Sequence, residues 1–220
     1  MGKITFGIPK ELVLELKRIF SIDLFIETGT FQGGTTSWAA KHFKEVYTVE
    51  NSKELHAQTS AKFSHLSNIK FLLGNSPAQL KQIFNATHRP AILWLDAHWC
   101  GGLTYGAHDE CPLLDEIREV IASNQDHIIL IDDARLFLKP PSTYHADDQW
   151  PGLNEIIPLL LEKKGYYTFT CEDIIAAVPI KAKAELKHYF DTIHANEFPG
   201  GGLISNLKFV YRNIKRKYQN

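Results

Sequence analysis

Between residues 24 and 131, short apolar segments alternate with longer segments of helical periodicity. The apolar segments are largely continuous, which is typical of strands that are buried on both faces of a sheet. Strands that alternate with helices indicate βαβ units, and hence a parallel sheet with helices on both faces. The predicted strands span residues 24–26, 46–49, 69–73, 91–95 and 128–131, and the predicted helices between them span residues 33–43, 52–65, 76–84 and 112–123.

The pattern changes after the fifth strand. Residues 152–164 are predicted to form a helix, and two further strands follow at residues 166–171 and 174–179, separated only by Glu172 and Asp173. So short a link permits only an antiparallel hairpin, because a parallel crossover needs about a dozen residues or more. The predicted fold class is therefore α/β: a Rossmann-like, doubly wound, seven-stranded sheet, mostly parallel, with one antiparallel strand in a C-terminal hairpin.

The domain organisation follows from length and composition. A chain of 220 residues has the length of one α/β domain. We expect residues 1–197 to form this domain, with an N-terminal helix inside residues 1–22 and a proline-rich lid over residues 139–151. Residues 198–220 are predicted to form a glycine-rich break and a basic amphipathic helix, which packs on the domain or on a second subunit. The alternative for this helix is a weak contact with a membrane surface.

Net charge and cysteine content limit the classes of binding partner and the cellular compartment that we expect. The formal net charge is -1, whereas nucleic-acid-binding domains usually carry a strong basic excess, so we expect no nucleic-acid partner. Three cysteines are too few for a disulfide framework and fit a reducing compartment. No signal-peptide pattern is present, and no apolar run reaches the roughly 18–20 residues that cross a bilayer. These features predict a cytoplasmic protein without a transmembrane segment.

A glycine-rich turn follows the first strand. It contains Glu27, Gly29, Thr30 and Gly33, and its glycine spacing is G-x-x-x-G rather than the G-x-G-x-x-G of a dinucleotide-binding turn. Glycines at such a turn let backbone N–H groups approach a ligand closely. Glu27 would repel an anion but would favour a cationic sulfonium or an ammonium group. A tight turn without a ligand is the alternative interpretation.

Polar residues also end the next two strands. Glu50 ends the second strand, where a carboxylate is well placed to accept both hydroxyls of a ribose. Asn75 and Ser76 follow the third strand, and we expect Asn75 to contact an adenine edge and Ser76 to cap the next helix. A surface position is the alternative for Glu50.

Together, Glu27-x-Gly29-x-x-x-Gly33, Glu50, Asn75-Ser76 and the closing hairpin resemble a class I S-adenosylmethionine-dependent methyltransferase. The resemblance covers roughly residues 20–180. It implies that the turn from Gly29 to Gly33 wraps the methionine part of S-adenosylmethionine, that Glu50 holds the ribose, and that residues 75–76 lie beside the adenine.

Three aspartates follow the fourth and fifth strands: Asp96, Asp132 and Asp133. Carboxyl ends of neighbouring strands face one crevice, and converging carboxylates repel one another unless a cation or protonation compensates. Hard oxygen ligands of this kind suit Mg²⁺. The arrangement is similar to the metal-dependent, macrocin-type sugar O-methyltransferases, and this resemblance implies that the three aspartates are metal ligands. A turn or helix-capping role is the alternative.

His98 lies two residues after Asp96, where the macrocin-type enzymes have an acidic base. The ordinary pKa of histidine suits proton abstraction at neutral pH, so we predict His98 and Asp96 as catalytic residues. The alternative is a structural histidine stacked on an aromatic ring. A rival interpretation is a zinc site formed by His98, Cys100, His108 and Cys111, although their spacing matches no common zinc pattern.

The combined expectation is an S-adenosylmethionine-dependent O-methyltransferase, assisted by Mg²⁺, that acts on a hydroxyl of a small molecule such as a sugar or glycan. Polar and aromatic residues of the lid, including Tyr144, Asp148 and Trp150, suit such an acceptor. A homo-oligomer is compatible with the sequence. Two other classes stay open: a catalytically idle, methyltransferase-like binding module, and a nicotinamide-dependent oxidoreductase, against which the glycine spacing and Glu27 argue.

Overall fold

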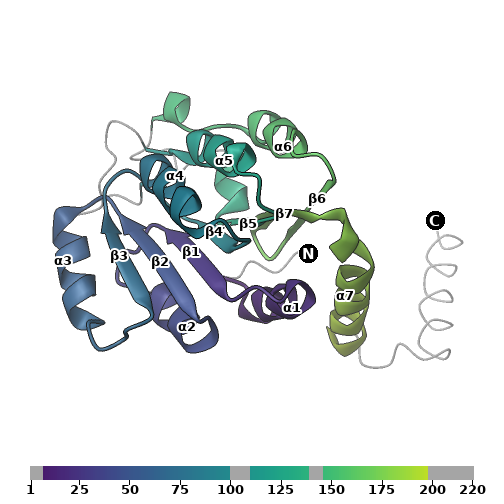
Figure 1. Cartoon of the computed structure of the whole chain (residues 1–220). Coiled ribbons are helices and arrows are strands. Elements are labelled where there is room, and N and C mark those ends of the chain that lie inside the picture. The colour runs from purple at the N-terminus through teal and green to yellow at the C-terminus, as the bar shows by residue number, and fades with distance from the viewer. Residues whose placement is uncertain (1–6, 100–109, 139–145, 198–220) are drawn as a thin grey trace, which may run out of the picture. The chain divides into compact units, whose positions relative to one another are not determined.

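A computed structural model of the chain describes residues 7–99, 110–138 and 146–197, with side chains to residue 192. Its centre is a seven-stranded sheet with the strand order β3-β2-β1-β4-β5-β7-β6 (Figure 1). Five strands are parallel, and β7 pairs antiparallel with both β5 and β6, as the short link between the last two strands predicts. The strands are β1 (Leu24–Thr28), β2 (Glu45–Glu50), β3 (Ile69–Leu73), β4 (Ile92–Leu95), β5 (Ile128–Ile131), β6 (Tyr166–Cys171) and β7 (Ile174–Pro179).

Helices connect the strands at the predicted places. Residues 1–180 form one compact unit and residues 181–220 a second, which contains α7 (Lys183–Glu197), a helix beyond the predicted elements. Short 3₁₀ turns are η1 (Ala134–Phe137), η2 (Asp147–Gln149) and η3 (Ile180–Ala182). In the first unit the helices are α1 (Lys10–Phe20), α2 (Gly34–His42), α3 (Lys53–Lys62), α4 (Ser76–Thr87), α5 (Leu113–Ala122) and α6 (Leu153–Leu161).

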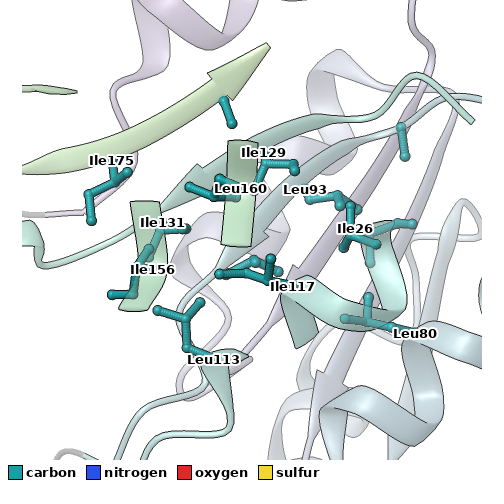
Figure 2. Close-up of a cluster of buried hydrophobic side chains, with 14 of the residues drawn as sticks. Ile26, Leu80, Leu93, Leu113, Ile117, Ile129, Ile131, Ile156, Leu160 and Ile175 are labelled. Carbon is teal, nitrogen blue, oxygen red and sulfur yellow. The ribbon is translucent and has the colours of Figure 1, made fainter. Parts of the chain in front are cut away.

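The two faces of the sheet are covered by different helices. Helices α4, α5 and α6 lie on one face, and α1 and α2 lie on the other (Figure 1). The face under α4, α5 and α6 forms the largest buried cluster of apolar side chains, and each fully buried aliphatic residue there contributes about 1.5–3 kcal/mol of transfer free energy. Members from the sheet and the helices interdigitate, as Figure 2 shows for Ile26, Leu80, Leu93, Ile117, Ile129, Ile156 and Leu160.

Two predicted segments are only partly covered by the described residues. The predicted lid lies outside them up to residue 145, and residues 147–149 form η2. The basic helix predicted for the tail, and the domain boundary at residue 198, also lie outside them. None of the helices in the described ranges is long and apolar enough to cross a membrane.

Candidate active site

The predicted site residues gather at the carboxyl ends of the parallel strands. Hydrogen bonds tie each strand end to its neighbour: Asp96 N donates to Thr28 O at 3.1 Å, and Asp132 N donates to Leu95 O at 3.2 Å. Gly74 N donates in the same way to Glu50 O at 3.0 Å. The strand order therefore sets the ends of β3, β2, β1, β4 and β5 side by side, which is the edge where open α/β sheets bind their ligands.

The glycine-rich turn packs directly against the end of β4. Gly29 has φ +87°, and a Cβ atom at this position would lie 2.1 Å from the carbonyl oxygen of Asp96. Gly33 has φ +73°, and its Cβ would lie 2.5 Å from the ring of Phe63. Both conformations favour glycine, and both contacts exclude a side chain. Gly29 thus brings the backbone of the turn against the end of β4, at Asp96, whereas Gly33 packs against the ring of Phe63.

Glu27 lies beneath this turn in a buried network of hydroxyl groups. Its Oε2 accepts hydrogen bonds from Thr48 Oγ1, at 2.7 Å, and from Thr36 Oγ1. Thr30 Oγ1 lies 2.6 Å from Thr48 Oγ1, so the hydroxyl of Thr30 faces the network. Burial raises the pKa of Glu27 to about 7, against the effect of the two hydroxyl donors, and the charge of Glu50 adds to the rise.

Glu50 is fixed by the backbone around it. Oε2 accepts a hydrogen bond from Phe31 N at 2.9 Å, and Oε1 accepts one from Ser52 N at 2.8 Å. The side chain is 7% exposed. Phe31 has φ +46°, an unfavourable conformation for an aromatic residue, and its ring is 53% exposed. The carboxylate of Glu50 therefore links the glycine-rich turn to the start of α3.

At the start of α4, the N-cap position belongs to Asn75 and not to Ser76. Asn75 is the N-cap residue, although its side chain makes no capping hydrogen bond, and Ser76 is the first helical residue. The prediction that Ser76 caps the helix is therefore wrong. The Oγ atom of Ser76 is buried and has no hydrogen-bond partner among the described residues. An unsatisfied buried hydroxyl is costly, and at a strand end it points to a polar ligand.

Asp96 and Asp132 carry carboxyl groups with raised pKa values. The pKa of Asp96 is well above its ordinary range, chiefly because of desolvation, and Asp132, Asp133 and Glu27 add to the rise. The side chain of Asp96 is still 30% exposed, which places it on the wall of a crevice rather than in the core. Burial, reinforced by the charge of Asp133, raises the pKa of Asp132 to about 6. Among the described residues, His98 lowers both pKa values and Arg135 lowers that of Asp132, but neither effect offsets desolvation.

Asp133 differs from these two because an imidazole and a guanidinium group both contact its carboxylate. Its Oδ2 lies 3.1 Å from His98 Nε2, and its Oδ1 accepts a hydrogen bond from Arg135 Nη1 at 2.7 Å. Burial alone would raise the pKa of Asp133, but the hydrogen bonds from His98 and Arg135 outweigh it and hold the pKa below its ordinary value. Arg135 Nη1 also pairs with Asp173 in the β6–β7 turn.

His98 is a buried residue between two of the aspartates. Its side chain is 6% exposed, and its Nδ1 lies 3.6 Å from Asp96 Oδ1, on the side opposite the contact with Asp133. The imidazole ring packs on the indole of Trp150, with 5.4 Å between the ring centroids. The structure thus brings together the two predicted catalytic residues, His98 and Asp96.

The predicted Mg²⁺ site finds no support in this arrangement. The described part of the chain contains no group of three or more histidine, cysteine, aspartate or glutamate residues arranged to hold a metal ion. The physical reason lies at Asp133, whose two carboxylate oxygens already face Arg135 and His98. The same search gives no support for the rival zinc site, of which Cys100 and His108 lie outside the described residues.

Several residues of this region are not among the predicted site residues. Thr48 and Thr36 bind Glu27, and Arg135 binds Asp133. Thr48 has a visible signal in the sequence, since it is a polar residue inside the apolar strand β2. Arg135 follows the Asp-Asp pair by two residues, but its reach to Asp173 depends on the pairing of β5 with β7.

Comparisons with known proteins bear on the fold. No protein-family model and no curated protein sequence matches the chain. Among solved structures, an O-methyltransferase from Bacillus cereus in complex with SAH matches with a TM-score of 0.55 and 16% identity, over 79% of this chain and 82% of that one. The SAH-bound methyltransferase PaMTH1 from Podospora anserina matches with a TM-score of 0.51 and 15% identity, over 76% of each chain. The methyltransferase domain of bacterial CtHen1 matches with a TM-score of 0.50 and 12% identity, over 77% and 96%.

These similarities, together with the strand order and the antiparallel β7, define the class I methyltransferase fold. The predicted fold class is confirmed. At these identities the likeness concerns the fold alone, because one fold hosts many activities.

Proposed function

We propose that this chain is an S-adenosylmethionine-dependent methyltransferase that transfers a methyl group to a hydroxyl of a small, polar acceptor. One observation carries the proposal. Three carboxyl groups, those of Glu27, Asp96 and Asp132, gather at the ligand-binding edge of the sheet with raised pKa values. A cationic ligand would relieve this desolvation, and S-adenosylmethionine carries both a sulfonium and an ammonium group.

The residues at the strand ends fit this cofactor by their chemistry. Glu27 and Asp96 would face the cationic methionine part, beside the turn that packs against the end of β4 at Gly29. Glu50 offers a carboxylate for the ribose hydroxyls, and the unsatisfied Ser76 hydroxyl offers a polar partner to the adenine end. SAH bound to two proteins of the same fold supports the choice of cofactor. When bound, S-adenosylmethionine supplies an activated methyl group and a neutral leaving group.

We assign proton removal to His98. Asp133 is held in its ionised form, so it accepts the Nε2 proton of His98 and leaves the ring lone pair on Nδ1. Nδ1, on the side of Asp96, then takes the proton of the acceptor hydroxyl, and Asp133 stabilises the resulting imidazolium. The packing of Trp150 on the imidazole keeps the ring in this orientation.

A sugar or another polyol is the proposed acceptor class. A cavity of about 250 Å³ opens beside Trp150, whose indole also packs on His98. Its lining mixes an aromatic surface with charged and amide groups, a combination that suits hydroxyl-rich ligands. The principal polar residues of the lining are Asp115, Arg118, Asp148, Gln149 and Glu155.

We derive no step through a divalent cation, because Arg135 and His98 already occupy the oxygens of Asp133. The Mg²⁺-assisted form that the sequence predicts has a direct test, since EDTA would abolish methyl transfer that needs the metal.

The proposal is tested by calorimetric titration of the protein with S-adenosylhomocysteine, with NADH as the comparison ligand. We expect binding of S-adenosylhomocysteine in the micromolar range, with the same affinity in EDTA and in Mg²⁺, and no binding of NADH. Absence of S-adenosylhomocysteine binding in both buffers would refute the proposed cofactor, and binding of NADH alone would favour the oxidoreductase.

A further inference from the structure

Glu110 is a buried carboxylate that the proposed chemistry does not use. It lies three residues before α5 and is 3% exposed. A buried carboxylate is unfavourable unless hydrogen bonds compensate for its lost hydration, so a glutamate at such a position calls for a specific reason.

Two hydrogen bonds to the carboxylate give that reason, and two more are made by the backbone of the same residue. Oε2 accepts from Trp150 Nε1 at 2.7 Å, and Oε1 accepts from Ala146 N at 3.0 Å. The backbone of Glu110 accepts from Trp99 N at 2.7 Å and donates to Gln149 Oε1 at 3.1 Å. One residue therefore joins the segment after β4, which carries His98, to residues 146–150.

Trp150 carries this contact to the active site. Its indole packs on the imidazole of His98, with centroids 5.4 Å apart, and on the ring of Phe137, with centroids 6.0 Å apart. The hydrogen bond from Nε1 to Glu110 fixes the rotation of the indole, which is only 7% exposed. An indole so fixed limits the imidazole to the position in which Nε2 faces Asp133.

We propose that Glu110 is a positioning residue that acts through Trp150 to hold His98 against Asp133. The inference rests on the proposed function, since His98 is a base only in that account. The carboxylate of Glu110 holds the indole of Trp150, and the indole holds the imidazole of His98.

The test reads the imidazole itself and needs no acceptor. The N–H of His98 that faces Asp133 is followed by ¹⁵N-resolved NMR, and His98→Ala identifies its signal. We expect Glu110→Ala to speed hydrogen exchange of this N–H by roughly 10- to 100-fold, the effect of losing one charge-assisted hydrogen bond in the chain of contacts. Glu110→Gln keeps an oxygen that can accept from the indole, so it should retain most of the protection.

Trp150→Phe separates the indole contact from general packing. This variant keeps an aromatic ring but removes the donor to Glu110, so we expect exchange at His98 to quicken as in Glu110→Ala. Trp38→Phe is the matched control, because Trp38 packs on Phe25 and Phe43 under the other face of the sheet. It should leave the His98 signal unchanged.

The outcomes keep this inference apart from the proposed function. Unchanged exchange in both Glu110→Ala and Trp150→Phe, with the fold retained by circular dichroism, would overturn the positioning role. An equal loss of protection in Glu110→Gln and in Trp38→Phe would also overturn it, because it would indicate general loosening. A wild-type protein that fails to bind S-adenosylhomocysteine would refute the proposed function, whereas the exchange data would still report on the contact.

Discussion

The acidic residues at the two ends of the parallel sheet differ in the direction of their pKa shifts. At the amino end, Asp23 pairs with Lys44 at 2.6 Å and with Lys17 at 3.4 Å, and Glu45 pairs with Lys70 at 2.6 Å. The hydrogen bond from Lys44 leads the effects that hold the pKa of Asp23 below its ordinary value. At the carboxyl end, the pKa values of Glu27, Asp96 and Asp132 are raised, and only Asp133 among the acidic site residues with a described shift has a lowered pKa, because His98 and Arg135 contact it.

Two buried polar side chains, one at each end of the sheet, differ in whether they have hydrogen-bond partners. His127, just before β5 at the amino end, is buried and uses both ring nitrogens: Nδ1 accepts from Ala91 N at 3.1 Å, and Nε2 lies 3.0 Å from Ser123 Oγ. Burial lowers its pKa to about 3, so it stays neutral. Ser76, at the carboxyl end, has a buried hydroxyl without a partner among the described residues. His127 is thus satisfied by the protein itself, whereas the hydroxyl of Ser76 fits the ligand that we propose for the carboxyl end.

The largest expected effect is on chemistry at the carboxyl end. His98→Ala should lower methyl transfer by about 10²- to 10⁴-fold, the range typical of a general base, while the affinity for S-adenosylhomocysteine changes little. The measurement is transfer of tritium from methyl-labelled S-adenosylmethionine to a panel of sugars and polyols. Transfer that survives the substitution would remove His98 from the mechanism.

The second-largest effect is a pH-dependent change in the free energy of unfolding, which we expect for Glu27→Gln. The folded-state pKa of Glu27 is raised from 4.5 to about 7, so its contribution to stability is fully present below pH 4.5 and is lost as the pH rises through about 7. At about 1.4 kcal/mol per pKa unit, the variant should be more stable than wild type by about 3 kcal/mol at pH 8, and equal to it at pH 4. Denaturant unfolding at both pH values measures this. The same variant should bind S-adenosylmethionine more weakly, and a stability gain that is equal at both pH values would contradict the assignment.

Glu50→Ala should weaken cofactor binding without affecting the amino end. Loss of a carboxylate that accepts charge-assisted hydrogen bonds costs about 1.5–3 kcal/mol, which corresponds to roughly 10- to 100-fold in Kd for S-adenosylhomocysteine. Glu54→Ala is the control, because Glu54 is exposed on α3 and accepts a hydrogen bond from Gln58 of the same helix. Calorimetry that gives equal affinities for the two variants would separate Glu50 from the cofactor.

The smallest effect is expected at the amino end. Lys44→Ala breaks the ion pair with Asp23, but Lys44 is 81% exposed, and such surface pairs contribute less than about 1 kcal/mol. Thermal unfolding should show a small shift, and the Kd for S-adenosylhomocysteine should not change. A marked loss of cofactor affinity in this variant would break the contrast between the two ends.

The sequence predicts the fold better than it predicts the site. Continuous apolar strands, helical periodicity and the two-residue link at Glu172 and Asp173 suffice for the seven-stranded sheet, because each is a local pattern. Strand ends also indicate where Glu27, Glu50, Asp96 and Asp132 converge. The partners of these groups depend on contacts distant in sequence, such as Arg135 with Asp173 and Glu110 with Trp150, which no local pattern encodes.

The two predictions that the structure does not support have the same origin. The metal site is predicted by counting carboxylates at strand ends, and such a count does not reveal that Arg135, whose position depends on the turn between β6 and β7, pairs with Asp133. The cap expected from Ser76 fails because the helix begins one residue earlier than the serine would need, with Asn75 as its N-cap.

The most direct test of the account is calorimetric titration with S-adenosylmethionine at pH 7 in two buffers of different ionisation enthalpy. A cation bound among Glu27, Asp96 and Asp132 lowers the raised pKa values of these groups. We therefore expect binding in the micromolar range with release of protons, and we expect the Glu27→Gln variant to release fewer protons on binding than the wild type. Absence of binding, or binding without proton release, would contradict the claim that the carboxyl end of the sheet is a site for a cationic cofactor.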